Sequence, residues 1–258
     1  MENKIDQLTN WVMEAKSVVF LGGAGVSASS GLMTFRSVAL CYQTLQLYGV
    51  EVEEILSYSY LFHHPFSFYD FLEHYLYKPH SLPNKAHRAL FRLETYGYLS
   101  SIVTQNIDGL HQLAGSKNVI ELHGSLNRFY CATCNKEYNP EDIFPIQEVP
   151  YCEKCRGNVR GQGLIRPDIV LYGEDLDESR YWEARRVIQS ADVLIVGGTS
   201  LEVYPANDLL NCYQGAKVVF INKSSTMYDE RADLVIYEPI EEVLTLVANR
   251  IQINQKEK

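Results

Sequence analysis

Two pairs of cysteines in the sequence have the spacing of a metal site. Cys131 and Cys134 form one C-x-x-C pair, and Cys152 and Cys155 form a second pair farther along the chain. Each pair can turn two thiolates toward one point, and two such pairs complete the tetrahedron that zinc prefers. Four thiolates leave no open coordination position, so we predict a structural zinc rather than a catalytic one. A redox role is the alternative, which two coincident pairs at metal spacing disfavour.

A glycine-rich turn follows a short apolar run near the start of the sequence. The run 17–21 predicts a buried strand, and the residues after it are small enough for a backbone to approach a pyrophosphate: Gly23, Ala24, Gly25, Ser27 and Ala28. A helix that began here would offer free N–H groups and the positive end of its dipole. Ala28 stands where a full G-x-G-x-x-G motif has its third glycine, so a simple turn is the alternative.

Small and polar residues also stand at the ends of other strand-like runs. They are Gln105, Asn106, Ile107 and Asp108 after the run 101–104, Gly198, Thr199 and Ser200 after the run 193–197, and Asn222 at the end of the run 218–222. The carboxyl ends of parallel strands meet at one edge of a sheet, where α/β proteins bind ligands. Capping or turn formation explains each motif alone, but their shared position favours a ribose and its phosphates as the ligand.

One histidine has a position that suits proton transfer. His123 follows the strand-like run 119–122 and precedes Gly124, so its imidazole can point into a crevice at the sheet edge. A neutral imidazole that titrates near neutral pH can abstract a proton. A buried histidine with a purely structural role is the alternative for an isolated residue of this type.

Helices and strands have to place these motifs next to one another in the fold. Short apolar runs alternate with helical patterns along most of the sequence, which predicts an α/β fold with a mostly parallel sheet and helices on both faces. Residues 4–16, for example, repeat apolar side chains at helical spacing. Two stretches lack this alternation of strands and helices: residues 37–83 predict a helical insertion, and residues 128–162 contain the four cysteines.

Length and charge restrict the class of protein. The 258 residues are enough for one large domain with a modest second lobe. The net charge of −9 argues against nucleic acid as a direct partner, although a zinc ribbon alone can be a nucleic-acid module. A lysine-rich peptide suits an acidic protein better. The first residues are charged and no apolar stretch reaches the ~20 residues that span a bilayer, so we expect a cytoplasmic protein with no membrane partner.

Taken together, the motifs resemble those of the sirtuin family. They occur in family order: the glycine turn with Ser30-Gly31 and Phe35-Arg36, then Thr104–His111, His123-Gly124, the cysteine quartet, Arg166–Glu174 and Gly198–Leu201. The resemblance implies a single sirtuin-type catalytic domain with a Rossmann-like lobe from residues 1–36, 84–127 and 163–258. A smaller lobe would combine the helical insertion, residues 37–83, with the zinc ribbon, residues 128–162.

The resemblance also implies an activity, the NAD-dependent removal of acyl groups from lysine side chains of a protein or peptide. Nicotinamide would leave the ribose of NAD, which is consumed, and the acyl oxygen would attack the exposed carbon. The products would be free lysine, nicotinamide and an O-acyl-ADP-ribose, which is O-acetyl-ADP-ribose for a deacetylase. NAD hydrolysis (as by an NAD glycohydrolase) or ADP-ribosyl transfer at the same site is an alternative. A non-catalytic NAD or acyl-lysine binding protein is another, which the presence of His123, Asn106 and Asp108 disfavours.

The same resemblance implies roles for individual residues. His123 would be the general base on a ribose hydroxyl, with Asn106 and Asp108 completing the catalytic set. The NAD-binding residues would be Gly23, Ala24, Gly25, Ser27, Ala28, Phe35, Arg36, Gln105, Asn106, Ile107, Asp108, His123, Gly198, Thr199, Ser200 and Asn222. The acyl-lysine would contact the backbone of Val170 and the side chain of Tyr172.

The sequence departs from the family pattern in two places. Leu32-Met33-Thr34 stands where the family usually has Ile-Pro-Asp, and the segment 37–42 lacks a glycine pair, so we expect the cofactor loop to close differently. Members that remove acidic acyl groups have a Tyr-x-x-Arg motif. Here Tyr69 is followed by Leu72, which cannot pair with a carboxylate. We therefore predict neutral acyl groups, acetyl above all.

Overall fold

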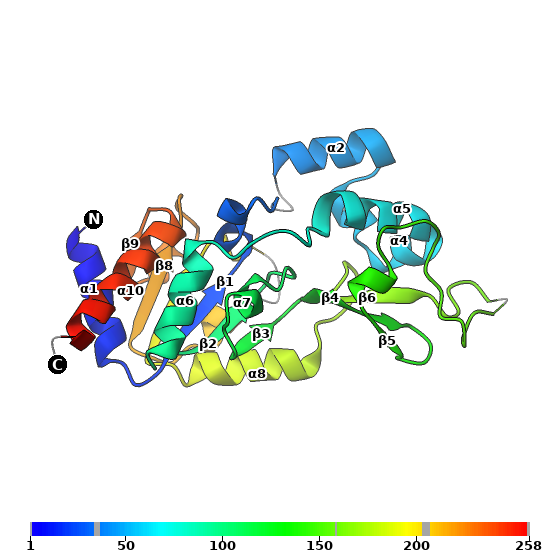
Figure 1. Cartoon of the computed structure of the whole chain (residues 1–258). Helices are drawn as coiled ribbons and strands as arrows, with labels where there is room; N and C mark the ends of the chain where they lie inside the picture. Colours follow the sequence, from blue (N-terminus) through cyan, green and yellow to red (C-terminus); the bar gives the residue numbers. More distant parts are fainter. Residues whose placement is uncertain (1, 34–36, 158, 203–206, 257–258) are drawn as a thin grey trace.

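The computed structural model describes residues 2–33, 37–157, 159–202 and 207–256 (Figure 1). Within these ranges the larger sheet has six parallel strands in the order β3-β2-β1-β7-β8-β9. Their bounds are β1 Val18–Gly22, β2 Leu99–Thr104, β3 Val119–Glu121, β7 Val193–Gly197, β8 Lys217–Ile221 and β9 Leu234–Ile236. Strands β1 and β7 are buried along their whole length, as expected for apolar runs in the middle of a parallel sheet. The predicted α/β fold is confirmed.

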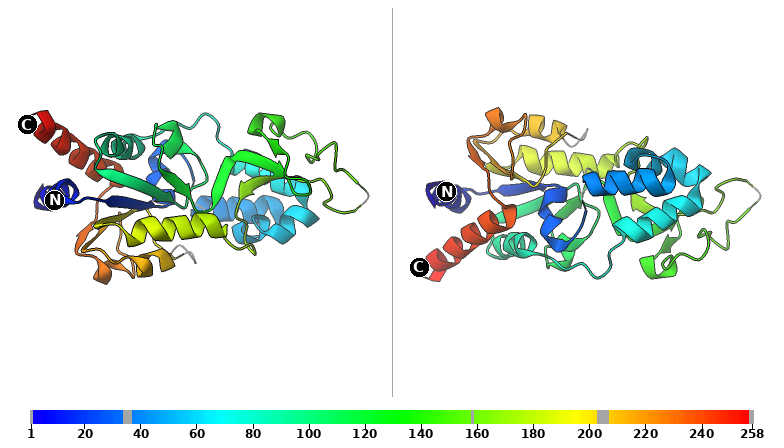
Figure 2. Two further views of the ribbon diagram at one scale, coloured as in Figure 1. Left: turned by 90° about the horizontal axis from the view of Figure 1, so that it is seen from below. Right: turned by 90° about the horizontal axis from the view of Figure 1, so that it is seen from above.

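Helices cover both faces of this sheet (Figures 1 and 2). One face packs against α1 (Glu2–Glu14), α6 (Lys85–Thr95) and α10 (Ile240–Lys256), and the other against α8 (Glu178–Gln189) and α9 (Asp208–Cys212). Neighbouring side chains of β1 point to opposite faces of the sheet. Phe20 packs in the core beneath α1, α6 and α10, and Leu21 packs in the core beneath α8 and α9. The periodic stretch at 4–16 forms α1, which buries its apolar side chains under α10.

A second, antiparallel sheet lies at the opposite end of the molecule from α1 and α10 (Figure 1). Its strands are β4 (Gly124–Cys131), β5 (Glu137–Tyr138) and β6 (Ile165–Ile169), in the order β5-β4-β6. The motif Arg166–Glu174 therefore begins within β6 and continues into the loop after it. This strand pairs antiparallel with β4 and lies outside the parallel sheet.

The insertion at 37–83 is helical, as predicted, and packs on the second sheet. It forms α2 (Val38–Tyr48), α3 (Val52–Ile55), α4 (Tyr58–His63), α5 (Pro65–Phe71) and a π-helical turn (Leu72–Leu76). Its apolar side chains share one core with β4 and β6, in which Phe68, Phe71 and Phe129 are buried. We call these helices and the second sheet the small lobe. The lobe boundaries in the sequence stay a prediction.

The segment after β1 differs from the helix that the sequence predicted there. Two short 3-10 helices follow the strand, Ala24–Val26 and Ala28–Ser30, and Gly31 ends them with a φ of 82°. Because each is a single turn, a full helix dipole is missing here, and an anion has to be bound by local N–H groups.

The remaining short elements complete the description. They are α7 (Leu110–Leu113) and the 3-10 turns Pro140–Asp142 and Asp229–Arg231. Over the described part of the chain, the helices are too short or too polar to cross a membrane.

Candidate active site

A pocket of about 810 Å³ lies where the carboxyl edge of the parallel sheet meets the small lobe. This volume suits a ligand of cofactor size. Most residues predicted for NAD and substrate line it: Ala24, Gly25, Ala28, Gln105, Asn106, Ile107, His123, Val170, Tyr172, Gly198, Thr199, Ser200 and Asn222. Gly23, Ser27 and Asp108 lie behind this lining, and Phe35 and Arg36 fall outside the described residues.

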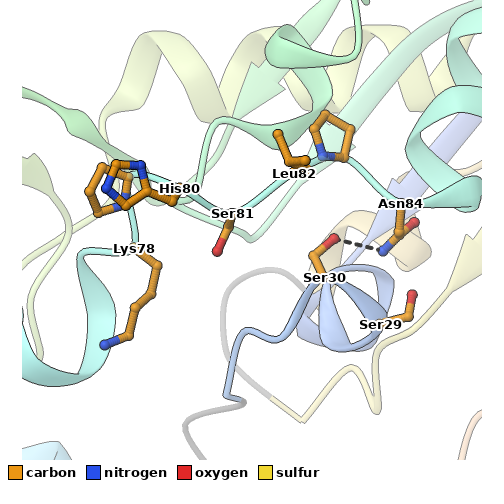
Figure 3. A pocket seen from close by; sticks show the side chains of 9 residues that line it. Ser29, Ser30, Lys78, His80, Ser81, Leu82 and Asn84 are labelled. Carbon is orange, nitrogen blue, oxygen red and sulfur yellow. Dashed lines mark hydrogen bonds between the residues drawn. The ribbon is translucent and has the colours of Figure 1, made fainter.

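A second hollow of about 600 Å³ lies between Ser29-Ser30 and the segment 78–84 (Figure 3). At one side of it, Asn84 Nδ2 donates a hydrogen bond of 3.0 Å to Ser30 Oγ. Its described lining contains no residue that the sequence predicted for the site. We therefore assign the chemistry to the larger pocket.

Two glycines bring the turns after β1 and β7 into backbone contact. The Gly25 N–H donates to the Gly198 carbonyl oxygen at 2.8 Å, and a Cβ added to Gly25 would lie 2.8 Å from the Gly198 Cα. Gly198 also has a φ of 62°, which most other residues avoid. Both N–H groups of the pair are bonded within the protein, since the Gly198 N–H donates to the Ile221 carbonyl oxygen at 3.1 Å. The pair offers bare backbone at a strand edge, which leaves room for the phosphates of NAD.

Asn106 is held by a chain of hydrogen bonds behind the pocket wall. Its Nδ2 donates to Ser27 Oγ at 3.0 Å, and Ser27 Oγ donates to Asp108 Oδ2 at 2.6 Å. The second oxygen of Asp108 accepts from the Leu110 N–H at 2.9 Å. Burial raises the pKa of Asp108, although its hydrogen bonds from Ser27 and Leu110 oppose the rise. Ser27 and Asp108 therefore orient Asn106 from behind.

His87 belongs to the same network, and it was not among the residues predicted for the site. It is fully buried, its Nε2 lies 3.4 Å from Ser27 Oγ, and its ring centroid lies 4.7 Å from that of His111. Burial lowers the pKa of His87 to about 4 and that of His111 to about 3. The spacing Asn84-x-x-His87 was a usable signal, because it forms a capping box that fixes both side chains at the start of α6.

His123 stands in the turn between β3 and β4 and lines the pocket. Its Nδ1 lies 2.9 Å from the carbonyl oxygen of Gln105. A carbonyl can only accept, so in this contact Nδ1 carries the proton and Nε2 keeps its lone pair. Burial lowers the pKa of His123, and the bond to Gln105 offsets only part of this effect. A neutral imidazole with a basic Nε2 is the form that a general base needs.

The loop after β6 presents Val170 and Tyr172 to the pocket. The Val170 N–H donates to the His123 carbonyl oxygen at 3.0 Å, which ties the loop to the histidine turn. A bidentate ion pair supports the loop, since Arg166 donates to both carboxylate oxygens of Glu174 at 2.6 Å. Such a fork-to-fork pair fixes geometry as well as charge. Reasoning from sequence gave neither member of the pair a role, although its motif contained both.

The part of the pocket next to the small-lobe core is apolar. Five of its lining residues also pack in that core: Leu56, Leu76, Ile107, Ile169 and Leu171. Tyr69 and Leu72 are fully buried behind them, and the Tyr69 hydroxyl donates to the Ile165 carbonyl oxygen. Among the described lining residues, Lys223 is the only lysine or arginine, and it lies in the loop after β8.

The four cysteines meet at one point of the small lobe. The Sγ atoms of Cys131, Cys134, Cys152 and Cys155 all lie within 4.8 Å of one another. Cys131 is the last residue of β4 and Cys134 follows it, and the second pair lies in the segment that leads to β6. Four thiolates so close together fit a tetrahedral zinc ion, which would join two turns outside the pocket lining.

Comparisons with known proteins agree with this arrangement. Residues 23–205 match the Sir2 family. NAD-dependent protein deacetylases of Clostridium acetobutylicum and Clostridium perfringens are 45% and 46% identical to the chain over 246 and 245 residues. In both cases the match covers 95% of this chain and 98% of the relative.

Solved structures resemble the whole chain. One, described as "Structural Basis for the Mechanism and Regulation of Sir2 Enzymes", has a TM-score of 0.86 and 34% identity, covering 98% of this chain and 100% of the other. A second, "Sir2-p53 peptide-NAD+", has a TM-score of 0.81 and 33% identity over 98% and 99% of the two chains. The resemblance that the motifs predicted is confirmed: the chain belongs to the Sir2 family.

Proposed function

We propose that the chain is an NAD-dependent protein-lysine deacetylase that releases nicotinamide and O-acetyl-ADP-ribose. The observation that carries the proposal is a single pocket that joins the Gly25–Gly198 contact, the imidazole of His123 and the loop at Val170. The names of the Clostridium relatives support this activity, as do the peptide and NAD in the Sir2 structure described above.

We infer a role for each part of the pocket, which the geometry supports. NAD supplies an electrophilic ribose carbon as its nicotinamide departs. The glycine pair admits the pyrophosphate, and Asn106 is aimed at the ribose and the nicotinamide amide by its bond to Ser27. The Val170 backbone positions the acyl-lysine, and the apolar wall excludes water from the acyl group. His123 Nε2 then accepts a proton from a ribose hydroxyl, while its Nδ1 bond to Gln105 stabilises the resulting imidazolium.

One incubation separates this activity from the two alternatives. Purified protein is mixed with NAD, with and without an acetyl-lysine peptide, and products are identified by mass. O-acetyl-ADP-ribose that appears only with peptide supports the deacetylase. Nicotinamide release that is independent of peptide favours NAD hydrolysis or ADP-ribosyl transfer, and no consumption of NAD favours a binding protein.

The partner and the location follow from charge and thiol chemistry. The chain has a net charge of −9, and Asp175 and Glu202 line the pocket, so a lysine-rich protein or peptide is the proposed substrate. We propose that the protein acts in the cytoplasm, where reducing conditions keep the four cysteines available to zinc.

Deacetylation should stay constant around neutral pH and decline only in acid. His123 acts as a base when it is neutral, and its lowered pKa keeps it neutral at a pH where an exposed histidine, with a pKa of about 6.5, is half protonated. The profile of kcat/KM against pH reports this group in the free enzyme, with circular dichroism at each pH as the control for folding. An acidic limb centred above pH 6.5 would contradict the assignment.

An acetyl-lysine peptide should have a kcat/KM about tenfold or more above that of the same peptide with succinyl-lysine. The five aliphatic side chains next to the small-lobe core offer a succinyl carboxylate no partner, so burying it there is costly. Butyryl-lysine is the matched control, because it has the same chain length without the charge and should also exceed succinyl-lysine. Faster turnover of the succinyl peptide would contradict the prediction.

A further inference from the structure

The chain crosses from the larger sheet to the small lobe at the turn that contains His123 (Figure 1). Strand β3 ends at Glu121 and β4 begins at Gly124, which pairs with Ile169 of β6. His123 therefore lies opposite Val170, whose N–H donates to the His123 carbonyl oxygen at 3.0 Å. Any contact that fixes this turn also fixes the acyl-lysine loop beside it. The inference drawn from this arrangement rests on the proposed function.

Strand β4 is irregular directly after this turn. Its pairing register with β6 skips residues 126–128, which form a bulge in the strand. The Leu126 N–H donates outside the second sheet, to the carbonyl oxygen of the pocket residue Ile107 at 2.9 Å. Bulges next to active sites direct side chains that a regular strand would place elsewhere. The last residue of this bulge is Arg128.

The guanidinium of Arg128 binds two carboxylates from different strands. Its Nη2 lies 2.8 Å from Oε2 of Glu121 in β3, and its Nε donates to Oδ2 of Asp168 in β6 at 2.9 Å. Asp168 also accepts two hydrogen bonds from Arg180 Nη2, at 2.8 and 3.1 Å. Since Arg180 belongs to α8, these four side chains join the larger sheet and one of its covering helices to the second sheet.

The two carboxylates are shielded from water more than the arginine between them. The side chain of Glu121 is 9% exposed and that of Asp168 is 23% exposed, against 50% for Arg128. Within the described part of the chain, Asp168 has Arg180 as a second cation, whereas Glu121 forms no second ion pair. A buried carboxylate without a cation is costly. Loss of Arg128 therefore leaves an unpaired buried charge two residues before His123.

We propose that Arg128 is a positioning residue for the deacetylation reaction. It lies outside the lining of the pocket, so it acts through its neighbours. By pairing with Glu121 and Asp168 it holds the β3–β4 turn against β6, and this keeps His123 Nε2 and the backbone of Val170 in one geometry. Such positioning affects the rate strongly, because a misplacement of about 1 Å caused far from the reacting atoms can cost about 10²-fold.

Steady-state kinetics of Arg128→Gln tests the proposal. We expect kcat with an acetyl-lysine peptide to fall by about tenfold or more. The NAD dissociation constant, measured by calorimetry, should stay within about threefold, because the Gly25–Gly198 contact does not involve these ion pairs. Arg128→Lys keeps the charge but lacks the planar fork that reaches both carboxylates, so its kcat should lie between those of the unmodified protein and Arg128→Gln.

A double variant separates positioning of His123 from any other effect on kcat. In a His123→Ala background, Arg128→Gln should lower kcat further by less than about threefold, because the residue through which it acts is gone. An equal loss in both backgrounds would overturn the proposal.

Nitrogen NMR of the histidine rings gives a readout that needs no turnover. In the unmodified protein the Nδ1-protonated tautomer of His123 should dominate, because Nδ1 donates to Gln105. Arg128→Gln should shift the His123 ring signals, which are identified by their absence in His123→Ala. Arg186→Gln is the matched control: it removes the same charge from an exposed residue of α8 outside these ion pairs, and should change neither the signals nor kcat.

The two readouts also separate this inference from the proposed function. Circular dichroism checks that each variant folds, and Arg128→Lys carries the same comparison if Arg128→Gln does not fold. An active deacetylase in which the Arg128 variant changes neither kcat nor the His123 signals would contradict this inference alone. A protein that forms no O-acetyl-ADP-ribose, but whose His123 signals respond to Arg128→Gln, would contradict the proposed function instead.

Discussion

Replacing His123 with alanine should lower kcat for deacetylation by about 10²–10⁴-fold, the usual contribution of a general base. The substitution removes the Nε2 that takes the ribose proton, and it leaves the carbonyl oxygen of Gln105 without its imidazole donor. The Gly25–Gly198 contact, which we propose lies at the phosphates, does not involve this side chain, so NAD affinity should change much less than kcat. Steady-state kinetics with an acetyl-lysine peptide and calorimetry with NAD measure the two quantities.

His80→Ala is the matched control for this variant. His80 is an exposed histidine that lines the second hollow rather than the larger pocket, so its removal should leave kcat unchanged. Circular dichroism checks that both variants keep the fold. A folded His123→Ala protein with kcat within tenfold of the unmodified enzyme would remove His123 from the mechanism.

Loss of zinc should unfold the small lobe and abolish activity. The four thiolates join two turns that lie against β4, and structural zinc sites contribute apparent binding free energies of about 10–16 kcal/mol in small domains. The damage should reach the pocket because the Tyr172 N–H donates to Leu56 and the Tyr58 N–H donates to Tyr172, so the acyl-lysine loop is tied to the small-lobe helices.

Metal analysis and thermal unfolding test this second prediction. The unmodified protein should contain about one zinc per chain, and Cys152→Ser or a strong chelator should remove it and lower the unfolding temperature. Cys41→Ser and Cys212→Ser are controls, since these thiols lie outside the cysteine cluster. A Cys152→Ser protein that keeps its unfolding temperature would show that zinc has no structural role.

Much of the site could be predicted from the sequence because its motifs are short and each lies within one segment of the chain. The spacing of two cysteine pairs, the glycine turn after β1 and the polar residues at strand ends each depend on a few neighbouring positions. Parallel strands then carry those ends to one edge, which is why Gln105 and Thr199, 94 residues apart, come within 3.1 Å. Their catalytic and binding roles stay predictions until the variants above are measured.

The features that sequence reasoning missed depend on contacts between distant segments. A short apolar run does not reveal which sheet it joins, so the pairing of β6 with β4 in a separate sheet could not be predicted. The contact of His87 with Ser27, 60 residues earlier, could not be read along the chain, although the Asn84-x-x-His87 spacing indicates its capping box. The bonds between the Asn222 amide and the backbone of Thr199 were likewise not predicted. Asn222 also lines the pocket, and its role in ribose binding stays a prediction.

The central place of β1 in the larger sheet sets the order in which the protein can assemble during synthesis. Its partner β2 follows at Leu99–Thr104, but its other partner, β7, begins only at Val193. Until β7 leaves the ribosome, one edge of a fully apolar strand has no hydrogen-bonding neighbour, and such an edge invites pairing with other chains. The strand that leads into the glycine turn therefore has an unpaired edge for the whole time between its own synthesis and that of β7.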